Sequence, residues 1–400
     1  MDRWTWPAWV GVVGGLVAFA ALLVPLVALQ SRRYGRLSAW RLLGAAAVAV
    51  YGVALLAYTL LPLPSGDLAA WCARYGVGGP QLRPLQFVAD IRRDTAGLGL
   101  AATLRSAAVL QVVFNVLLFV PWGVLVRRFL GWGVLASTLS AAGASLLIET
   151  TQTTGIFGLI GCAYRLGDVD DLLTNTLGGL IGALVAPLVL GRMPRPGELA
   201  AARGVPRPVT ALRRWLGMAV DVALVTAVGY ALVVAYRLLL LSTGRPIPVD
   251  GDAVELLVGT VLPVAVLLWL PPLVGSGASL GQRAMWLEPR WRGSDGLLRR
   301  GTPGRRAARG ALGVGLWGLL QVLAALPGQG SGGGAAGAVA VVAAVAQPVL
   351  VVASALAVPW SRGHRGLSYA VARAELVDAR AVPAGSGPAP DRHQEVAPGR

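Results

Sequence analysis

The chain has 400 residues, of which 55% are apolar and 14% are charged, and its mean hydropathy is +0.65. Soluble domains carry about 25% charged residues, so this composition indicates a membrane protein. The formal net charge of +16 comes from 35 basic residues, all of them arginine, and the absence of lysine excludes a P-loop, a Schiff base and a pyridoxal anchor. The two histidines, His364 and His393, lie near the C-terminal end, which excludes serine–histidine catalysis and histidine-based haem or zinc sites elsewhere.

Nine apolar segments of the sequence approach the length of about 20 residues that a bilayer requires. The eighth is short and the ninth consists mostly of Ala, Val and Gly, so a bundle of eight helices is the alternative. The first could instead be a signal peptide, but it is long and lacks a clear small-residue cleavage site. We predict an all-α, polytopic transmembrane bundle of about nine helices, five followed by four. The segments are residues 9–29, 42–61, 107–126, 132–151, 172–190, 218–241, 254–274, 310–326 and 335–358.

The distribution of arginine predicts how these helices are oriented. If the N-terminus is outside and the helices alternate, 26 of the 35 arginines fall in cytoplasmic segments, as the positive-inside rule requires. These arginines are spread over five separate segments, which favours attraction to anionic lipid headgroups over a nucleic-acid partner. We therefore predict an external N-terminus, a cytoplasmic C-terminus, membrane lipids as partners and no nucleic acid.

Composition also divides the chain near residues 192–212, a Pro- and Arg-rich stretch that we expect to be unsuited to a helix. We predict a membrane domain over residues 1–192, a cytoplasmic linker over 193–212, a second membrane domain over 213–379 and a disordered tail over 380–400. The halves show no obvious sequence repeat, so an inverted-repeat transporter is not indicated. The absence of lysine, with abundant Ala, Gly, Val and Arg, indicates a GC-rich bacterial genome.

Polar side chains gather in the third to fifth segments, although such groups are costly in hydrocarbon and usually mark function or helix packing. Glu149 and Gln152 are spaced to project from one helix face. In the predicted topology the whole set lies towards the extracytoplasmic side, and we predict a ligand-binding site there. Its members are Asn115, Glu149, Gln152, Arg165, Asp168, Asp170, Asp171 and Asn175.

Several of these residues also have a structural explanation. Asp168 and Asp171 could cap the fifth helix and complement its dipole, which is the favoured reading for those two alone. Asn115 and Asn175 could join helices by hydrogen bonds. Glu149 requires a partner, and Arg165 is the nearest candidate. Such a pair among three aspartates keeps a net negative charge, which suits a cationic ligand group or, as the only cofactor we consider, a divalent cation.

An ordered series of residues in this region resembles the VanZ-like family over residues 45–190. Two upstream pieces, residues 58–62 and 83–87, also match. The resemblance implies a multi-pass protein of the bacterial plasma membrane, because VanZ-like proteins have this form, and it implies a role in the cell envelope, because the founding member is associated with teicoplanin resistance. The series comprises Asn115, Phe119, Pro121, Gly123, Glu149, Gln152, Arg165, Asp168, Asp170, Asp171, Asn175, Gly178 and Gly182, of which the two last glycines also form a small-residue packing face.

The second half is similar to the RDD membrane domain. Arg213 and Arg214 followed by Asp221 match the first Arg and Asp of that family, and the turn at residues 275–283, which contains Gly281, matches its glycine-rich turn. Tyr369 stands where the family usually has its second Asp. The resemblance implies a loose link to transport or ion handling, and we expect Arg214 and Asp221 to form a structural pair at the inner surface.

Cys72 and Cys162 both fall in predicted outer loops. An oxidising exterior permits a disulfide between them. Two isolated thiols are the alternative, because a Cα separation cannot be read from sequence.

Three functions fit these observations. The leading one is a non-enzymatic binding or accessory protein of the envelope, whose outer site engages a cell-wall precursor, a lipid headgroup or a glycopeptide antibiotic. The second is a hydrolase of a lipid-linked substrate, in which Glu149 and the three aspartates bind Mg²⁺ or Mn²⁺ and activate water. The third is a transporter that uses the RDD-like half, although that half has almost no ionisable residue at mid-membrane.

Overall fold

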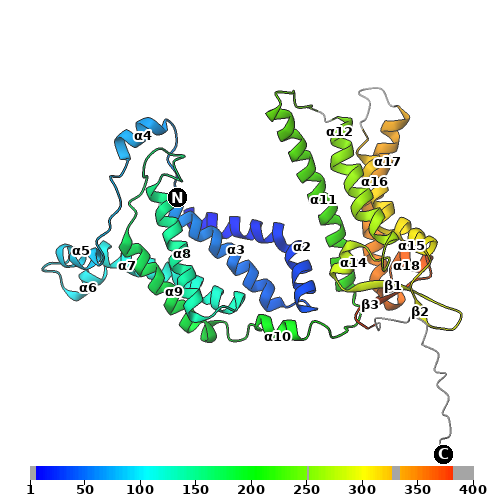
Figure 1. Cartoon of the computed structure of the whole chain (residues 1–400), viewed down its shortest axis with the longest axis horizontal. Helices are drawn as coiled ribbons and strands as arrows, with labels where there is room; N and C mark the ends of the chain where they lie inside the picture. The colour runs from blue at the N-terminus through cyan, green and yellow to red at the C-terminus, as the bar shows by residue number, and fades with distance from the viewer. Residues whose placement is uncertain (1–5, 250–251, 327–333, 382–400) are drawn as a thin grey trace, which may run out of the picture. The chain divides into compact units, whose positions relative to one another are not determined.

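Helices dominate the computed structural model, which describes residues 6–249, 252–326 and 334–381 (Figure 1). In these residues nine helices are long and apolar enough to cross a membrane, which confirms the predicted fold class and helix number. Their outer faces expose large apolar side chains, such as Leu188 at 86% and Val345 at 62%, as expected for contact with lipid. The orientation of the helices in the membrane stays a prediction. The predicted disordered tail lies outside the described residues apart from Arg380 and Ala381.

The chain divides into two compact units, one of residues 1–26 and 37–201 and the other of residues 27–36 and 202–400. Residues 27–34 of α2 (Gly15–Tyr34), at the end of the first apolar helix, therefore belong to the second unit. There the main-chain oxygen of Ser31 accepts the indole N–H of Trp286 at 2.8 Å, and Arg32 stacks on the same indole.

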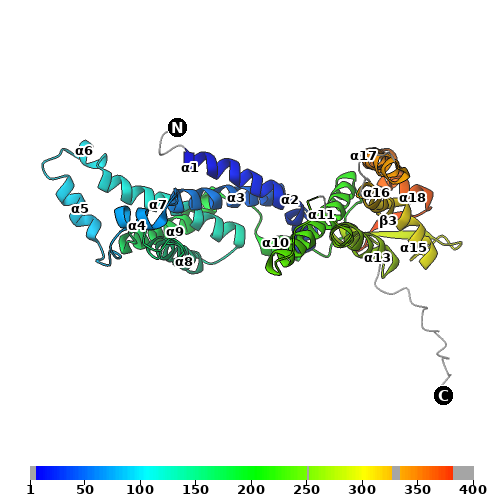
Figure 2. The same cartoon turned by 90° about the horizontal axis from the view of Figure 1, so that it is seen from above.

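The first unit is built on the close pairing of α7 and α9, with α8 against α9 (Figure 2). Phe119 of α7 is fully buried among Leu55, Ala141 and Ile148. The elements of this unit, which includes α2 only as far as Leu26, are α1 (Trp6–Trp9), η1 (Val10–Gly14), α2 (Gly15–Tyr34), α3 (Ala39–Leu60), α4 (Leu68–Tyr75), α5 (Gln86–Asp94), α6 (Leu100–Leu104), α7 (Ala107–Leu125), η2 (Val126–Leu130), α8 (Val134–Thr153), α9 (Val169–Val189) and α10 (Pro196–Ala201).

Glycines allow α7 and α9 to approach this closely. A Cβ atom at Gly178 or Gly182 would collide with the main-chain oxygen of Val116 or Val120 on α7, and one at Gly123 would collide with the main chain of α9. Small residues at such an interface let two membrane helices pack through their backbones.

Short helices form in two places where we expected none. Residues 62–106 contain α4, α5 and α6, and the expectation that residues 192–212 are unsuited to a helix is wrong over α10. α10 begins at Pro196, where the missing N–H has no intrahelical partner to lose, and Glu198 lies in its first turn.

In the described part of the second unit, four helices are long and apolar enough to cross a membrane, and three short strands form an antiparallel sheet of order β2-β1-β3. The sheet was not predicted, because its strands are short and β1 pairs with β3 from Leu287↔Asp378 to Arg290↔Glu375, far apart in sequence. The elements are α11 (Ala211–Ser242), α12 (Ala253–Leu256), η3 (Leu257–Val261), η4 (Val264–Trp269), α13 (Leu270–Leu273), α14 (Leu280–Ala284), β1 (Leu287–Arg292), β2 (Leu298–Arg299), α15 (Pro303–Gly310), η5 (Ala311–Gly315), α16 (Leu316–Ala324), α17 (Ala335–Trp360), η6 (Arg362–His364), α18 (Leu367–Val371) and β3 (Glu375–Asp378).

Candidate functional site

The first candidate site lies where α8 ends and α9 begins. Glu149, in the last part of α8, is half-buried, and its Oε2 accepts the main-chain N–H of Asp168 at 3.0 Å. Asp168 is the N-cap of α9, since its Oδ1 accepts the N–H of Asp170 at 2.8 Å. Burial raises the pKa of the Asp168 carboxyl, and the charges of Asp170 and Asp90 act in the same direction, against the hydrogen bonds from Asp170 and Gln81.

Asp171 connects this site to α7. Its Oδ1 accepts Nδ2 of Asn115 at 2.5 Å, and Gln111, one turn before Asn115, also bonds to this carboxylate. The carboxylates of Asp171 and Asp168 lie near enough to Glu149 to repel its charge. We call Glu149, Asp168 and Asp171, with the amides of Gln111 and Asn115, the acidic cluster.

Asp170 faces a different partner from its two neighbours in sequence. Its carboxylate accepts the main-chain N–H groups of Leu85 at 2.6 Å and Phe87 at 2.8 Å. The segment just before them is fastened as well, because the N–H of Gln81 donates to the oxygen of Gly167 and the oxygen of Gln81 accepts the N–H of Val169. The matched piece at residues 83–87 therefore docks on the start of α9.

The side chains of Gln152 and Arg165 both donate hydrogen bonds to main-chain oxygens at the C-terminal end of α3. Nε2 of Gln152 donates to the oxygen of Thr59 at 2.6 Å, and the Arg165 guanidinium donates to the oxygens of Leu61 at 2.7 Å and Tyr58 at 3.4 Å. The last carbonyls of a helix have no intrahelical donor. The predicted pairing of Arg165 with Glu149 is therefore wrong: the part of the chain that the structure describes has no such ion pair, because the α3 carbonyls take the guanidinium instead.

The remaining predicted residues of this region contribute to packing. Asn175 joins α9 to α8 by donating from Nδ2 to Oγ of Ser145 at 2.9 Å, in buried surroundings. Pro121 lies within α7 between the buried Phe119 and Gly123. Gly178 and Gly182 face α7, as described above.

Cys72 and Cys162 form a disulfide with a Cα–Cα separation of 5.8 Å. It joins α4 to the loop between α8 and α9. A main-chain bond from the N–H of Val77 to the oxygen of Ala163 runs beside it at 3.0 Å. This loop and the 62–106 segment thus hold each other over the acidic cluster's end of the first unit.

Hydrogen bonds within the protein hold the acidic side chains of this region. Among the described residues no group of three or more His, Cys, Asp or Glu side chains is arranged to hold a metal ion. The three carboxylates of the acidic cluster and that of Asp170 each accept at least one hydrogen bond from an N–H group of the protein. Among the described residues, no arginine forms an ion pair with the acidic cluster. Its negative charge therefore suits a cationic ligand group.

The second unit uses its predicted residues to lock its own fold. Asp221 accepts Oγ of Ser279 at 2.6 Å and the N–H of Gly281 at 2.7 Å, and a side chain at Gly281 would collide with the backbone of α11. Arg213 forms an ion pair with Asp378 at 2.9 Å, in which Arg380 also participates. Burial acts to raise the pKa of Asp378, but hydrogen bonds from Arg380 and Arg207 and the charge of Arg213 hold it below its ordinary value.

The expected pair of Arg214 and Asp221 is wrong as a direct contact, since the described residues contain no ion pair between them. Arg214 instead lies over the ring of Tyr369, with 4.7 Å between its guanidinium carbon and the ring centroid. Arg309 lies over the same fully buried ring at 5.1 Å. Asp221 is occupied by the turn at Ser279 and Gly281, so the aromatic ring takes the place of a carboxylate partner for both arginines.

Several residues that contact the predicted site residues were not identified from the sequence. Gln111 could have been found, because it lies four residues before Asn115 and so shares a helix face with it. Arg309 and Asp378 gave no such signal: each lies far in sequence from the residues it contacts.

Comparison with known proteins places the acidic cluster inside a family match. The family model described as VanZ/LLP1 matches residues 48–190, close to the residues 45–190 over which we expected this resemblance. The match includes α7, α8 and α9 and stops before the second unit, for which the RDD resemblance stays a prediction. No curated protein matches the chain, and no solved structure matches it.

Proposed function

We propose that the chain is a multi-pass plasma-membrane protein of the bacterial cell envelope, and that its VanZ-like region is a binding or accessory module. The acidic cluster is proposed as its extracytoplasmic site. The ligand we favour carries an ammonium group, as part of a cell-wall precursor or of a teicoplanin-type glycopeptide.

One observation carries this proposal: the N–H of Asp168 donates to Glu149, the charges of Asp168 and Asp171 act on Glu149, and Arg165, which was expected to pair with Glu149, is bonded to the end of α3. Neighbouring like charges repel one another, and the binding of a cation relieves that repulsion. The amides of Gln111 and Asn115 fix the position of Asp171, so the cluster is organised before a ligand arrives.

No observation favours the hydrolase or the transporter to the same degree. A metal-assisted hydrolase requires a set of ligands that the described carboxylates do not form. For the second unit we propose an RDD-like membrane domain, which the turn at Gly281 closed on Asp221 supports.

The test uses the full chain expressed in a teicoplanin-susceptible bacterium and, separately, in lipid nanodiscs with teicoplanin as the probe. We expect Glu149→Gln and Asp171→Asn to weaken binding at least tenfold and to return the inhibitory concentration of the drug to that of cells without the protein. Glu198→Gln, at an exposed glutamate of α10, is the matched control and should behave as the wild type.

The same variants decide against the proposal if both insert normally and neither changes drug binding nor the inhibitory concentration. Arg165→Ala separates anchoring from binding. Because Arg165 donates to the carbonyls of Leu61 and Tyr58, we expect the Arg165→Ala substitution to lower thermal stability more than ligand affinity.

A further inference from the structure

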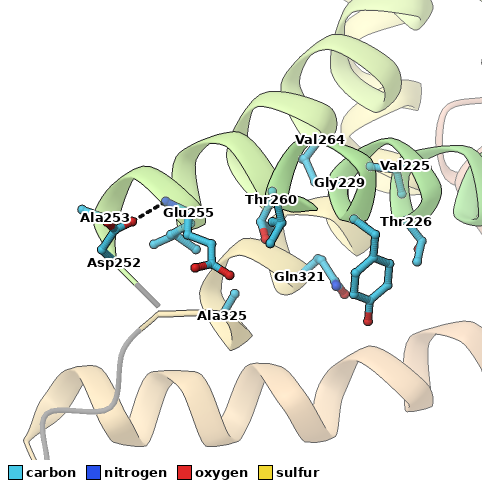
Figure 3. Close-up of a pocket in the computed structure, with 14 residues that line it drawn as sticks. Val225, Thr226, Gly229, Asp252, Ala253, Glu255, Thr260, Val264, Gln321 and Ala325 are labelled. Atoms are coloured by element: carbon cyan, nitrogen blue, oxygen red, sulfur yellow. Dashed lines mark hydrogen bonds between the residues drawn. The ribbon is translucent and has the colours of Figure 1, made fainter. Parts of the chain in front are cut away.

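A cavity of about 450 Å³ opens in the second unit between α11, the α12–η3 helix and α16 (Figure 3). This volume lies within the range of about 300–1,000 Å³ that is typical of small-molecule sites. One wall is apolar and continues into the core of the unit through Val225 and Val264. The cavity shares no residue with the acidic cluster, so it is independent of the function proposed above.

The polar side of the cavity is rich in acceptors. The 14 described lining residues include two carboxylates, Asp252 and Glu255, and no cationic side chain. Thr226, Tyr230 and Thr260 add hydroxyl groups. In Figure 3 the Glu255 carboxylate points into the space between the helices, on the side of Ala325.

Only one of the two carboxylate oxygens of Glu255 accepts a hydrogen bond from the protein. An Arg237 fork would normally engage both oxygens of a carboxylate, but here Nε at 3.1 Å and NH2 at 2.8 Å both converge on Oε1. Oε2 of Glu255 is buried and has no hydrogen-bond partner, and the whole side chain is 15% exposed. A buried carboxylate oxygen without a donor is costly, so a ligand that donates to Oε2 of Glu255 would remove that cost.

The acceptors of Asp252 and Gln321, by contrast, already have partners within the protein. Asp252 caps α12 through the N–H of Glu255 and accepts the hydroxyl of Tyr236. The side-chain amide of Gln347 donates to the side-chain oxygen of Gln321. The helix that carries Glu255 continues as the π-helical stretch η3, a form of helix that is frequent at functional sites.

We propose that this cavity binds a small organic ammonium compound. Its charged N–H group donates to Oε2 of Glu255, and its apolar body lies against Val225, Val233 and Val264. Arg237 offsets the charge of one of the two lining carboxylates, so the cavity keeps a net negative charge. That charge, the unsatisfied Oε2 and the apolar wall together select an amine over a neutral or anionic molecule of the same shape.

The test uses the full chain in phosphatidylcholine nanodiscs, with empty nanodiscs to subtract partition into lipid. The probe is 2-phenylethylamine, and 2-phenylethanol and 3-phenylpropionate present the same ring with a neutral and an anionic group. Saturation-transfer NMR and calorimetry should show the amine binding at least tenfold more tightly than either comparator.

Two variants and one control make the result specific. Glu255→Gln should reduce amine affinity at least tenfold and leave the alcohol unchanged, and Ala325→Trp, at the exposed end of α16, should block the amine without touching the carboxylate. Glu198→Gln, in the other unit, should have no effect. The proposal is overturned if the amine gives only the signal of empty nanodiscs, or if Ala325→Trp binds it like the wild type. Failure of the teicoplanin test would leave this result unaffected, because the two sites have no residue in common.

Discussion

The carboxylate of Asp170 accepts the main-chain N–H of Phe87 at 2.8 Å, across 83 residues of sequence. Together with the bond from the N–H of Leu85, this contact fastens the start of α5 to the first turn of α9. The side chain that sequence alone offers as a ligand is therefore the anchor of the 62–106 segment.

Asp170→Asn should loosen that segment. Because the neutral amide replaces a charge-assisted acceptor, we expect a loss of about 1–3 kcal/mol in the local stability of the contact. Hydrogen exchange measured by mass spectrometry should show faster exchange of the Leu85 and Phe87 amides. Asp94→Asn, at an exposed aspartate of α5, is the control, and equal protection in both variants would contradict the anchoring role.

Gly178→Ala and Gly182→Ala should each destabilise the first unit. The added methyl group would collide with main-chain oxygens of α7, which cannot move aside as a flexible side chain can. We expect a cost of about 1–3 kcal/mol and a lower unfolding temperature in detergent. Gly143→Ala, in α8, has open space at its Cβ and should be neutral or stabilising. A destabilisation of the same size in all three variants would count against close helix packing as the cause.

Cys72 and Cys162, the two cysteines of the chain, should give no free thiol until the protein is reduced. In intact cells, a membrane-impermeant maleimide should label both after treatment with an impermeant reductant, because the predicted topology places them outside. Labelling that requires permeabilised cells would reverse the predicted orientation. Labelling without a reductant would show that the thiols are free.

Asp378 should make the second unit sensitive to acid. Its folded pKa lies below its ordinary value of about 3.9, so its ion pairs stabilise the fold above that pH and are lost as the pH falls through the folded pKa. Asp378→Asn should lower stability by about 3 kcal/mol at pH 7, since Arg213 and Arg380 lose their partner. The difference from the wild type should shrink towards pH 3 in unfolding measurements. Asp295→Asn, in the turn of the same sheet, is the control; a pH-independent difference would refute the linkage.

Tyr369 should tolerate loss of its hydroxyl better than loss of its ring. Tyr369→Phe removes the hydroxyl that accepts from Arg309 at 3.3 Å and also bonds Arg214, at a cost of about 1–2 kcal/mol. Tyr369→Leu also removes the ring on which Arg214 and Arg309 lie, so we expect a loss of about 2–4 kcal/mol. Thermal unfolding should show a larger loss of stability for Tyr369→Leu than for Tyr369→Phe. Equal losses would show that the stacking of Arg214 and Arg309 on the ring does not contribute to stability.

The number and position of the membrane helices followed from sequence, because a bilayer-spanning helix is defined by consecutive apolar residues and its hydrogen bonds are local. The cap at Asp168 and the packing glycines Gly178 and Gly182 were visible for the same reason. Each depends on residues within a turn or two of helix, and the region that holds them is the region the VanZ/LLP1 family match covers.

The partners of the polar side chains were decided only by the tertiary structure. Nothing near Gln152 or Arg165 in sequence shows that their side chains donate to the carbonyls of Thr59 and Leu61, which lie 93 and 104 residues earlier. Likewise, the antiparallel pairing of β1 with β3 and the stacking of Arg309 on Tyr369 depend on how distant segments pack. A charged group takes whichever unsatisfied partner the packed helices bring within reach, and that choice has no local signature.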